Sequence, residues 1–156
     1  MKPSYKPVGG VERVALYPAH AVEMALFSNE GCEVSLAGTP IEVELIDDGS
    51  FYEETIENKC GVTRISHRLH LCASRECAEA WLDNEFLEQM ALDGVVAVAS
   101  LNDGRTLLVG YSAHFEAEQP LRLESLTSTS GSELHETPVV TLQLHSHDTA
   151  FSAEIL

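Results

Sequence analysis

Histidine and cysteine are the side chains in this sequence with the most evident potential for chemistry, and there are seven histidines and four cysteines. The densest group is the run H-x-x-H-x-C-x-x-x-x-C, formed by His67, His70, Cys72 and Cys77. A tetrahedral zinc site needs ligands that converge on one point. On a strand, however, His67 points to the face opposite His70 and Cys72. We therefore interpret the run as a strand followed by a helix start with two buried thiols, and we predict no metal site.

A second pair of histidines, His145 and His147, is spaced so that both rings point to the same face of a strand, with Asp148 next to them. A metal site here needs at least one further ligand from elsewhere in the chain. The remaining candidates for that ligand are His20, His114 and His135. We interpret the pair as histidines at the edge of a sheet.

Patterns that support catalysis or phosphate binding are absent from the sequence. There is no G-x-S-x-G elbow, and Ser128, Ser130 and Ser132 lie in residues 128–137, a stretch rich in small polar residues that predicts a polar loop. Cys77 stands near a helix start but beside apolar residues, which favours a small core residue over a nucleophile. Adjacent carboxylates such as Glu53 and Glu54 point in opposite directions on a strand. We therefore predict no catalytic residue, no cofactor and no enzymatic activity.

One stretch, residues 74–92, has a convincing helical period. Ala78, Leu82, Phe86 and Met90 recur at four-residue steps, and Trp81 and Leu92 flank this apolar stripe. Ser74 is a suitable N-cap, and Gly94 is a suitable left-handed stop. The sequence therefore predicts one amphipathic helix over about residues 75–92, which must pack on a sheet to bury its apolar face.

The stretches on both sides of the helix alternate in the manner of strands. Residues 41–47 place Ile41, Val43 and Leu45 on one face, and the Asp-Asp-Gly that follows predicts a hairpin between residues 41–46 and 50–57. Residues 62–72 form the longest strand pattern. Residues 95–101 are almost continuously apolar, which favours a central strand covered on both faces. An Asn-Asp-Gly turn then predicts a second hairpin into residues 105–112.

Further strands are predicted from the same alternation, and they complete the fold class. They are residues 12–17, 21–27, 33–37, 120–127 and 138–145, and in the last of these Val140, Leu142 and Leu144 are expected to face inward. The count of about ten strands with one helix predicts a mainly β, α+β fold, an antiparallel sandwich or barrel with the helix on its flank or across one end. We predict a flexible N-terminal arm over residues 1–10 and a single domain over residues 11–156.

Composition limits the classes of partner. The chain has 9 basic and 25 acidic residues and a formal net charge of -16, which argues against binding nucleic acid or an anionic membrane. No apolar run approaches the length of a membrane span, and the first ten residues lack the apolar core of a signal peptide. We expect an intracellular protein in which Cys32, Cys60, Cys72 and Cys77 are reduced.

The order of segments carries a family resemblance. A DGSFYEETIENKCGVTRISHRLHL stretch precedes the helix, and GVVAVASLNDGRTLLVGY and PLRLESLTSTSGSELHETPVVTLQL follow it. Gly110 stands soon after the second hairpin, and Ser130-Gly131 precedes the last long strand. Over roughly residues 41–144 the chain resembles small β-rich virion proteins encoded in prophages of gut Bacteroides-type bacteria, which are similar to phage tail tube or tail-completion subunits.

The resemblance implies a structural protein that assembles into homomeric rings, commonly hexamers, and stacks with other virion proteins. It implies a cytoplasmic location before assembly and the virion afterwards. An acidic lumen suits a tube that conducts DNA, because like charges repel the phosphate backbone. The alternative is a non-catalytic ligand-binding or adaptor β-barrel, which requires an apolar interior cavity with a few polar groups. A metal-dependent enzyme would require ligands to gather at residues 67–77 or at His145 and His147.

Overall fold

The computed structural model describes residues 10–46, 49–112, 117–129, 138–148 and 152–155. Before the helical region the strands are β1 (Val11–Pro18), β2 (Val22–Phe27), β3 (Cys32–Leu36), β4 (Ile41–Glu42), β5 (Phe51–Lys59) and β6 (Val62–Ser74). A 3-10 helix, η1 (Cys77–Leu82), and an α-helix, α1 (Asn84–Leu92), follow. The remaining strands are β7 (Val95–Leu101), β8 (Thr106–Val109), β9 (Tyr111–Ser112), β10 (Ala117–Glu118), β11 (Arg122–Thr129), β12 (Val139–Asp148) and β13 (Ala153–Glu154).

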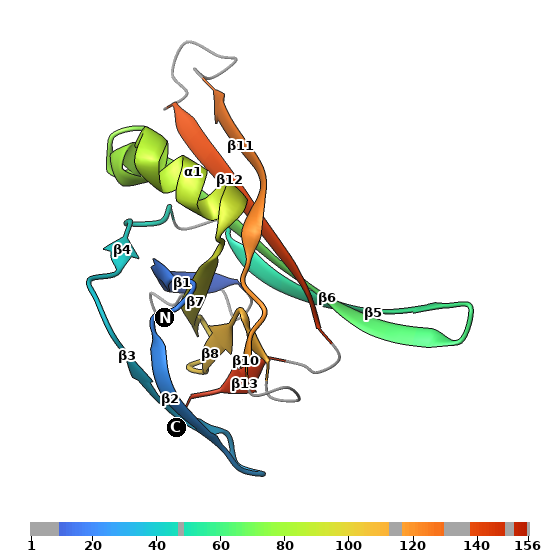
Figure 1. Ribbon diagram of the computed structural model, residues 1–156. Helices are drawn as coiled ribbons and strands as arrows, with labels where there is room; N and C mark the ends of the chain where they lie inside the picture. Colours follow the sequence, from blue (N-terminus) through green and yellow to red (C-terminus); the bar gives the residue numbers. More distant parts are fainter. Residues whose placement is uncertain (1–9, 47–48, 113–116, 130–137, 149–151, 156) are drawn as a thin grey trace, which may run out of the picture.

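Two antiparallel sheets enclose the main core. One sheet has the order β13-β8-β7-β1-β4 and the other β11-β12-β6-β5, while the β2–β3 and β9–β10 pairs form two smaller sheets. Leucines and valines from both large sheets meet in one buried cluster, to which Trp81, Phe86 and Met90 of the helical region contribute. The expected mainly β, α+β class is confirmed, and the described strands do not close into a barrel. Figure 1 shows α1 at one end of the body, beside β11 and β12.

The predicted central strand is confirmed as β7, the middle strand of its sheet. Val95, Ala97 and Ala99 face the main core. Val96 is buried in a second cluster, with Cys32 of β3 and Leu108 of β8. The β2–β3 hairpin therefore covers the second face of this sheet, which explains why the sequence of β7 is apolar at every position but one.

The helical stretch predicted over about residues 75–92 is confirmed in its position, but it is divided into two shorter helices, η1 and α1. Asp83 lies between the two helices and has an extended backbone (φ -66°, ψ 128°). Its carboxylate accepts a hydrogen bond from the Phe86 backbone N–H at 3.3 Å. An aspartate is a better N-cap than an interior helix residue, so α1 begins at that position. Ser74 accepts the Cys77 backbone N–H at 3.4 Å, which ties down the start of η1.

The apolar stripe of the helical region is nonetheless largely buried. Ala78, Phe86 and Met90 lie in the main core, and Leu82 is partly buried against it. Leu92, which was expected to flank the stripe, is 65% exposed. Leu92 is the last residue of α1.

The hairpin predicted between residues 41–46 and 50–57 is also wrong. Ile41 and Glu42 pair with β1, whereas β5 pairs along its whole length with β6. The turn between β5 and β6 is Cys60-Gly61, in which both residues have positive φ (52° and 81°), the conformation that suits a two-residue antiparallel loop. The nine residue pairs that this turn closes outweigh the local turn preference of Asp-Asp-Gly. The second predicted hairpin is confirmed as the β7–β8 pair.

Several expectations concern residues that the structure does not describe. The predicted arm falls there except for Gly10, as do Asp47, Asp48 and residues 130–137 of the polar loop. Ser128 and Thr129, assigned to that loop from sequence, instead end β11. Among the described residues, neither helix has the length or the apolar character to span a membrane.

Gly94 allows the chain to turn sharply from α1 into β7. Its φ is +83°, and its backbone N–H donates to the Gln89 carbonyl oxygen at 2.8 Å, as predicted for a left-handed helix stop. An added Cβ would lie 2.7 Å from Pro120 Cβ and 2.8 Å from the Leu121 carbonyl oxygen. A Cβ at Gly38, where φ is +88°, would meet no atom within 4 Å.

We therefore predict that Gly94→Ala lowers the free energy of unfolding by about 2–5 kcal/mol, from left-handed strain and steric overlap together. The matched control Gly38→Ala carries only the strain and should lose about 1–2 kcal/mol. Urea denaturation measures both. Equal losses for the two variants would contradict the close packing at Gly94.

The four cysteines are free thiols but differ in accessibility. Cys32 and Cys72 are buried, while Cys60 and Cys77 are exposed. The expectation that Cys77 is a core residue is thus wrong, because η1 turns its Cys77 side away from the sheet. Burial raises the pKa of the Cys32 thiol, which keeps it protonated and unreactive at neutral pH.

We predict that a thiol reagent such as dithionitrobenzoate modifies two cysteines quickly in the native protein and all four in urea. Cys60→Ser and Cys77→Ser should each remove one fast equivalent, and Cys32→Ser should remove none. Fast modification of all four thiols under native conditions would be inconsistent with the packing around Cys32.

Candidate functional site

The four-stranded sheet carries polar side chains on both faces, and the pairing of β6 with β12 determines which face each takes. In this pairing Leu144 lies opposite Leu69, Ser146 opposite His67, and His147 opposite Ser66. Because side chains alternate, the inner face of both strands changes from leucines to polar residues toward one end. Val140, Leu142 and Leu144 are fully buried, which confirms the predicted inward face of the last long strand.

On the inner face, Tyr52, His67 and Ser152 form one hydrogen-bonded group, which we call the inner cluster. The Tyr52 hydroxyl contacts His67 Nδ1 and also lies 2.5 Å from Ser152 Oγ. Ser152 Oγ is 3.2 Å from the same His67 nitrogen, and the Ser152 backbone N–H donates to Glu54 at 3.1 Å. Residues of β5 and β6 are thereby joined to the segment that leads into β13.

Asp148, Ser112 and Ser146 continue the polar lining beside the inner cluster. The Ser112 hydroxyl donates to Asp148 at 2.8 Å, and the Ser146 hydroxyl donates to the Gln119 carbonyl oxygen at 2.7 Å. All three residues are buried, so each hydrogen bond offsets the desolvation of a polar group. The Ser112–Asp148 bond also links β9 to β12, between two different sheets.

The chemistry available to the inner cluster is restricted. A serine beside a histidine is the beginning of a nucleophile–base pair. Here the His67 nitrogen that would accept the Ser152 proton also contacts the Tyr52 hydroxyl, and His67 is only 4% exposed. Burial raises the pKa of Tyr52 far above its usual range, with Glu54 and Asp148 adding to the effect, so the hydroxyl stays protonated. We interpret the inner cluster as a structural element, a set of hydrogen bonds that joins β5 and β6 to the segment before β13.

A shallow polar pocket adjoins the inner cluster. It is lined by His67, Gly110, Tyr111, Gln119, Ser146, Asp148 and Ser152. The side chains fill it so closely that no water-sized space is enclosed. The pocket therefore differs from the large apolar cavity that a ligand-binding barrel requires.

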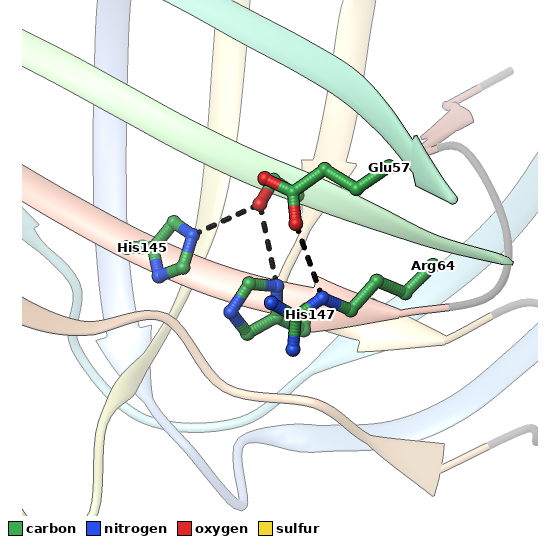
Figure 2. A network of polar contacts seen from close by, with 5 residues as sticks. Glu57, Arg64, His145 and His147 are labelled. Atoms are coloured by element: carbon green, nitrogen blue, oxygen red, sulfur yellow. Dashed lines mark hydrogen bonds and ion pairs between the residues drawn. The ribbon is translucent and has the colours of Figure 1, made fainter. Parts of the chain in front are cut away.

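On the outer face, His145, His147 and Ser66 form a second group, which we call the outer cluster. Figure 2 shows its two imidazoles beside Glu57 and Arg64. Ser66 Oγ lies 3.2 Å from His145 Nε2 and 3.3 Å from His147 Nδ1. The two rings meet edge to face, with their centroids 4.3 Å apart. Both imidazoles thus direct a nitrogen at the same hydroxyl.

Charged side chains surround the outer cluster in opposite pairs. Arg64 Nε lies 3.1 Å from Glu57, and Arg68 Nε lies 3.3 Å from Glu124. Desolvation lowers the pKa of both His145 and His147; Arg64 and Arg68 add to this effect, while Glu57 opposes it at both rings and Glu124 opposes it at His145. Both histidines are consequently neutral imidazoles at pH 7.

The structure separates the residues of the first histidine and cysteine run. His67 belongs to the inner cluster, while His70 stacks on Phe51 on the outer face, with ring centroids 4.7 Å apart. The Cys72 thiol donates to the Gly49 carbonyl oxygen at 3.5 Å, and Cys77 is exposed beyond the end of β6. The described residues contain no group of three or more His, Cys, Asp or Glu side chains placed to hold a metal ion.

The placement of His145 and His147 at a sheet edge is wrong, because β12 lies between β11 and β6. Of the three histidines considered as a third ligand, His20 approaches Glu118 at 3.3 Å, and His114 and His135 lie outside the described residues. Glu53 and Glu54 point in opposite directions as expected, since Glu54 contacts Ser152 while Glu53 is exposed.

Sequence reasoning did not identify Tyr52, Ser152 or Ser66 as members of polar clusters. Tyr52 and Ser152 are 100 residues apart, and their contact depends on the return of the chain to β13. Ser66 had a usable signal, because it shares a strand face with Arg64 and Arg68, but its histidine partners lie on a strand whose register no local pattern reveals.

Comparisons with protein-family models, with curated proteins and with solved structures each found no match to this chain.

We predict that Tyr52→Phe lowers the free energy of unfolding by about 1–3 kcal/mol, because it leaves His67 and Ser152 without a shared partner in a part-buried site. Chemical denaturation measures the loss. Tyr17→Phe is the matched control, since the Tyr17 hydroxyl has no hydrogen-bond partner within the described ranges, and it should change stability by less than about 0.5 kcal/mol. Equal losses of stability in the two variants would contradict a stabilising role for the Tyr52 hydroxyl.

Proposed function

We propose that this chain is a structural subunit that assembles with copies of itself into rings, as a tail tube-like or tail-completion protein of a prophage virion. The resemblance of residues 41–144 to such proteins supports the virion context. Features of the described strands support self-assembly, and the unpaired outer edge of β5 is the observation that carries this part of the proposal.

β5 is an end strand of its sheet, and no described strand pairs with its outer edge. It is nine residues long, which leaves a long row of backbone donors and acceptors free to pair with another chain. Figure 1 shows the β5–β6 hairpin projecting away from the body. Such an edge is suited to adding a strand from a neighbouring subunit.

Exposed apolar side chains on the β5–β6 and β2–β3 hairpins add to this argument. Ile56 and Val62 of the β5–β6 hairpin are 58% and 67% exposed, and Met24 and Leu26 of β2 are 54% and 55% exposed. Ile56 pairs with Ile65, so its side chain lies on the inner face of the sheet, which packs against the other sheet within the body. At the position of Ile56, however, the side chain is exposed. Contact with a second subunit would remove these side chains from water.

The proposed contact is of the head-to-tail kind, in which the hairpin of one copy meets a different surface of the next. Contacts of this kind close into rings when the rotation between neighbours allows it. The charge of -16 is compatible with a tube wall that does not bind DNA, and it also makes assembly dependent on ionic strength. The location we propose is the cytoplasm before assembly and the virion afterwards, with other virion proteins as partners.

We predict that the mass in solution, measured by light scattering after size exclusion, rises with protein concentration and with salt, because salt screens the repulsion between acidic subunits. A wild-type protein that stays monomeric under every condition would overturn the proposal.

Two edge variants identify the contact. In a two-residue hairpin, paired residues alternate between bonded and non-bonded positions, so the Asn58 N–H points away from β6. Asn58→Pro therefore removes a backbone donor that points toward the neighbouring subunit, and Ile56→Lys replaces an exposed apolar side chain with a charged one. Both should stay monomeric where the wild type assembles, while Asn58→Ala, which keeps the N–H, should assemble normally. Assembly of both edge variants at wild-type concentrations would exclude this hairpin as the interface.

A further inference from the structure

The outer cluster has the geometry of a small ligand set rather than of an ordinary surface pair. His145 and His147 come from one strand and Ser66 from the next, and the two imidazoles converge on the Ser66 oxygen. Figure 2 shows the two imidazoles side by side. Two ring nitrogens within 3.3 Å of one atom are close enough to share a single ion after a small rotation, since a metal–nitrogen bond is about 2.0–2.1 Å.

The imidazole that accepts from Ser66 directs a ring-nitrogen lone pair at the hydroxyl. A serine hydroxyl has one hydrogen and two lone pairs, so it donates to one imidazole and accepts an N–H from the other. A neutral imidazole carries its single proton on either ring nitrogen, so the second ring also presents a lone pair when that proton moves to its other nitrogen. In that tautomer both nitrogens are free to bind one metal ion.

The surroundings favour the neutral ligand form without blocking access. His147 is exposed, so an ion can reach the site from solvent. The charged groups facing it are balanced, with Arg64 and Glu57 on one side and Arg68 and Glu124 on the other. The lowered pKa of both imidazoles keeps them unprotonated at neutral pH, which is the state that binds metals.

From this convergence we propose that His145 and His147 bind a first-row divalent transition-metal ion through Nε2 and Nδ1, in place of Ser66. The described residues supply no third His, Cys, Asp or Glu ligand, so water fills the remaining positions and the site is an open one. By ligand type, the order of affinity should be Cu²⁺ above Ni²⁺, with Zn²⁺ weaker than Cu²⁺. Water thus takes the place of the further protein ligand that the sequence pattern called for.

Calorimetric titration of the untagged full chain with Zn²⁺ or Ni²⁺ alone tests the site. We expect one ion per chain, and His145→Asn and His147→Asn should each weaken binding by about tenfold or more. Asparagine keeps a polar group beside Ser66, which preserves the fold. His70→Asn is the matched control, because His70 lies on the same sheet face but stacks on Phe51, and it should bind as the wild type does.

A second measurement does not depend on any variant. Substoichiometric Cu²⁺ is paramagnetic, so in the wild-type protein it should broaden the NMR signals of His145, His147 and Ser66 before those of His20 and His70. Unchanged affinity in both histidine variants, broadening centred on another part of the chain, or no binding at millimolar metal would each overturn the proposal.

Discussion

The antiparallel ladder between β6 and β12 is the constraint on which the rest of the structure depends. It runs from Val139 opposite Ser74 to Asp148 opposite Ile65. Because side chains alternate, a slip of one residue would move Leu142 and Leu144 into solvent and His145 into the core. Burial of those leucines therefore fixes the register, and the same register assigns each polar residue of the two strands to its cluster. The apolar core thus sets the geometry of both polar clusters.

The length of β6 explains why one face changes its chemistry along the strand. β6 has 13 residues, more than the opposing sheet covers. Leu71 and Leu69 lie in the main core. His67 is the next residue on the same face, and it belongs to the inner cluster instead of the main core. Beyond that point Ile65 is still buried, whereas Ile56 opposite it and Val62 next to the turn are exposed. Core, polar tie and projecting arm are thus three successive parts of one strand pair.

Patterns of period two predicted the faces of the strands well, including the opposite directions of His67 and His70 and the burial of Val140. They did not predict which strands pair. Asp-Asp-Gly and Cys-Gly are both acceptable turns, and the choice between them depends on the long β5–β6 ladder, which is a tertiary property. The helix break at Asp83 follows similar logic, since a capping side chain outweighed a continuous apolar stripe. Contacts such as Tyr52 with Ser152 depend on chain closure over 100 residues, and no local pattern contains that information.

An open nine-residue edge strand is a risk of indiscriminate aggregation, and β5 carries features that oppose it. Its glutamates repel an identical edge, and the chain as a whole has a charge of -16. Glu57, however, is held by Arg64 of the same hairpin, so its charge is partly neutralised next to the exposed Ile56. Pairing of β5 with an identical β5 edge is therefore opposed by charge repulsion. Pairing with a different surface, one that covers Ile56 and avoids the remaining carboxylates, does not meet this repulsion. This asymmetry favours head-to-tail contacts between copies over symmetric edge-to-edge pairing, which is the condition that a ring imposes.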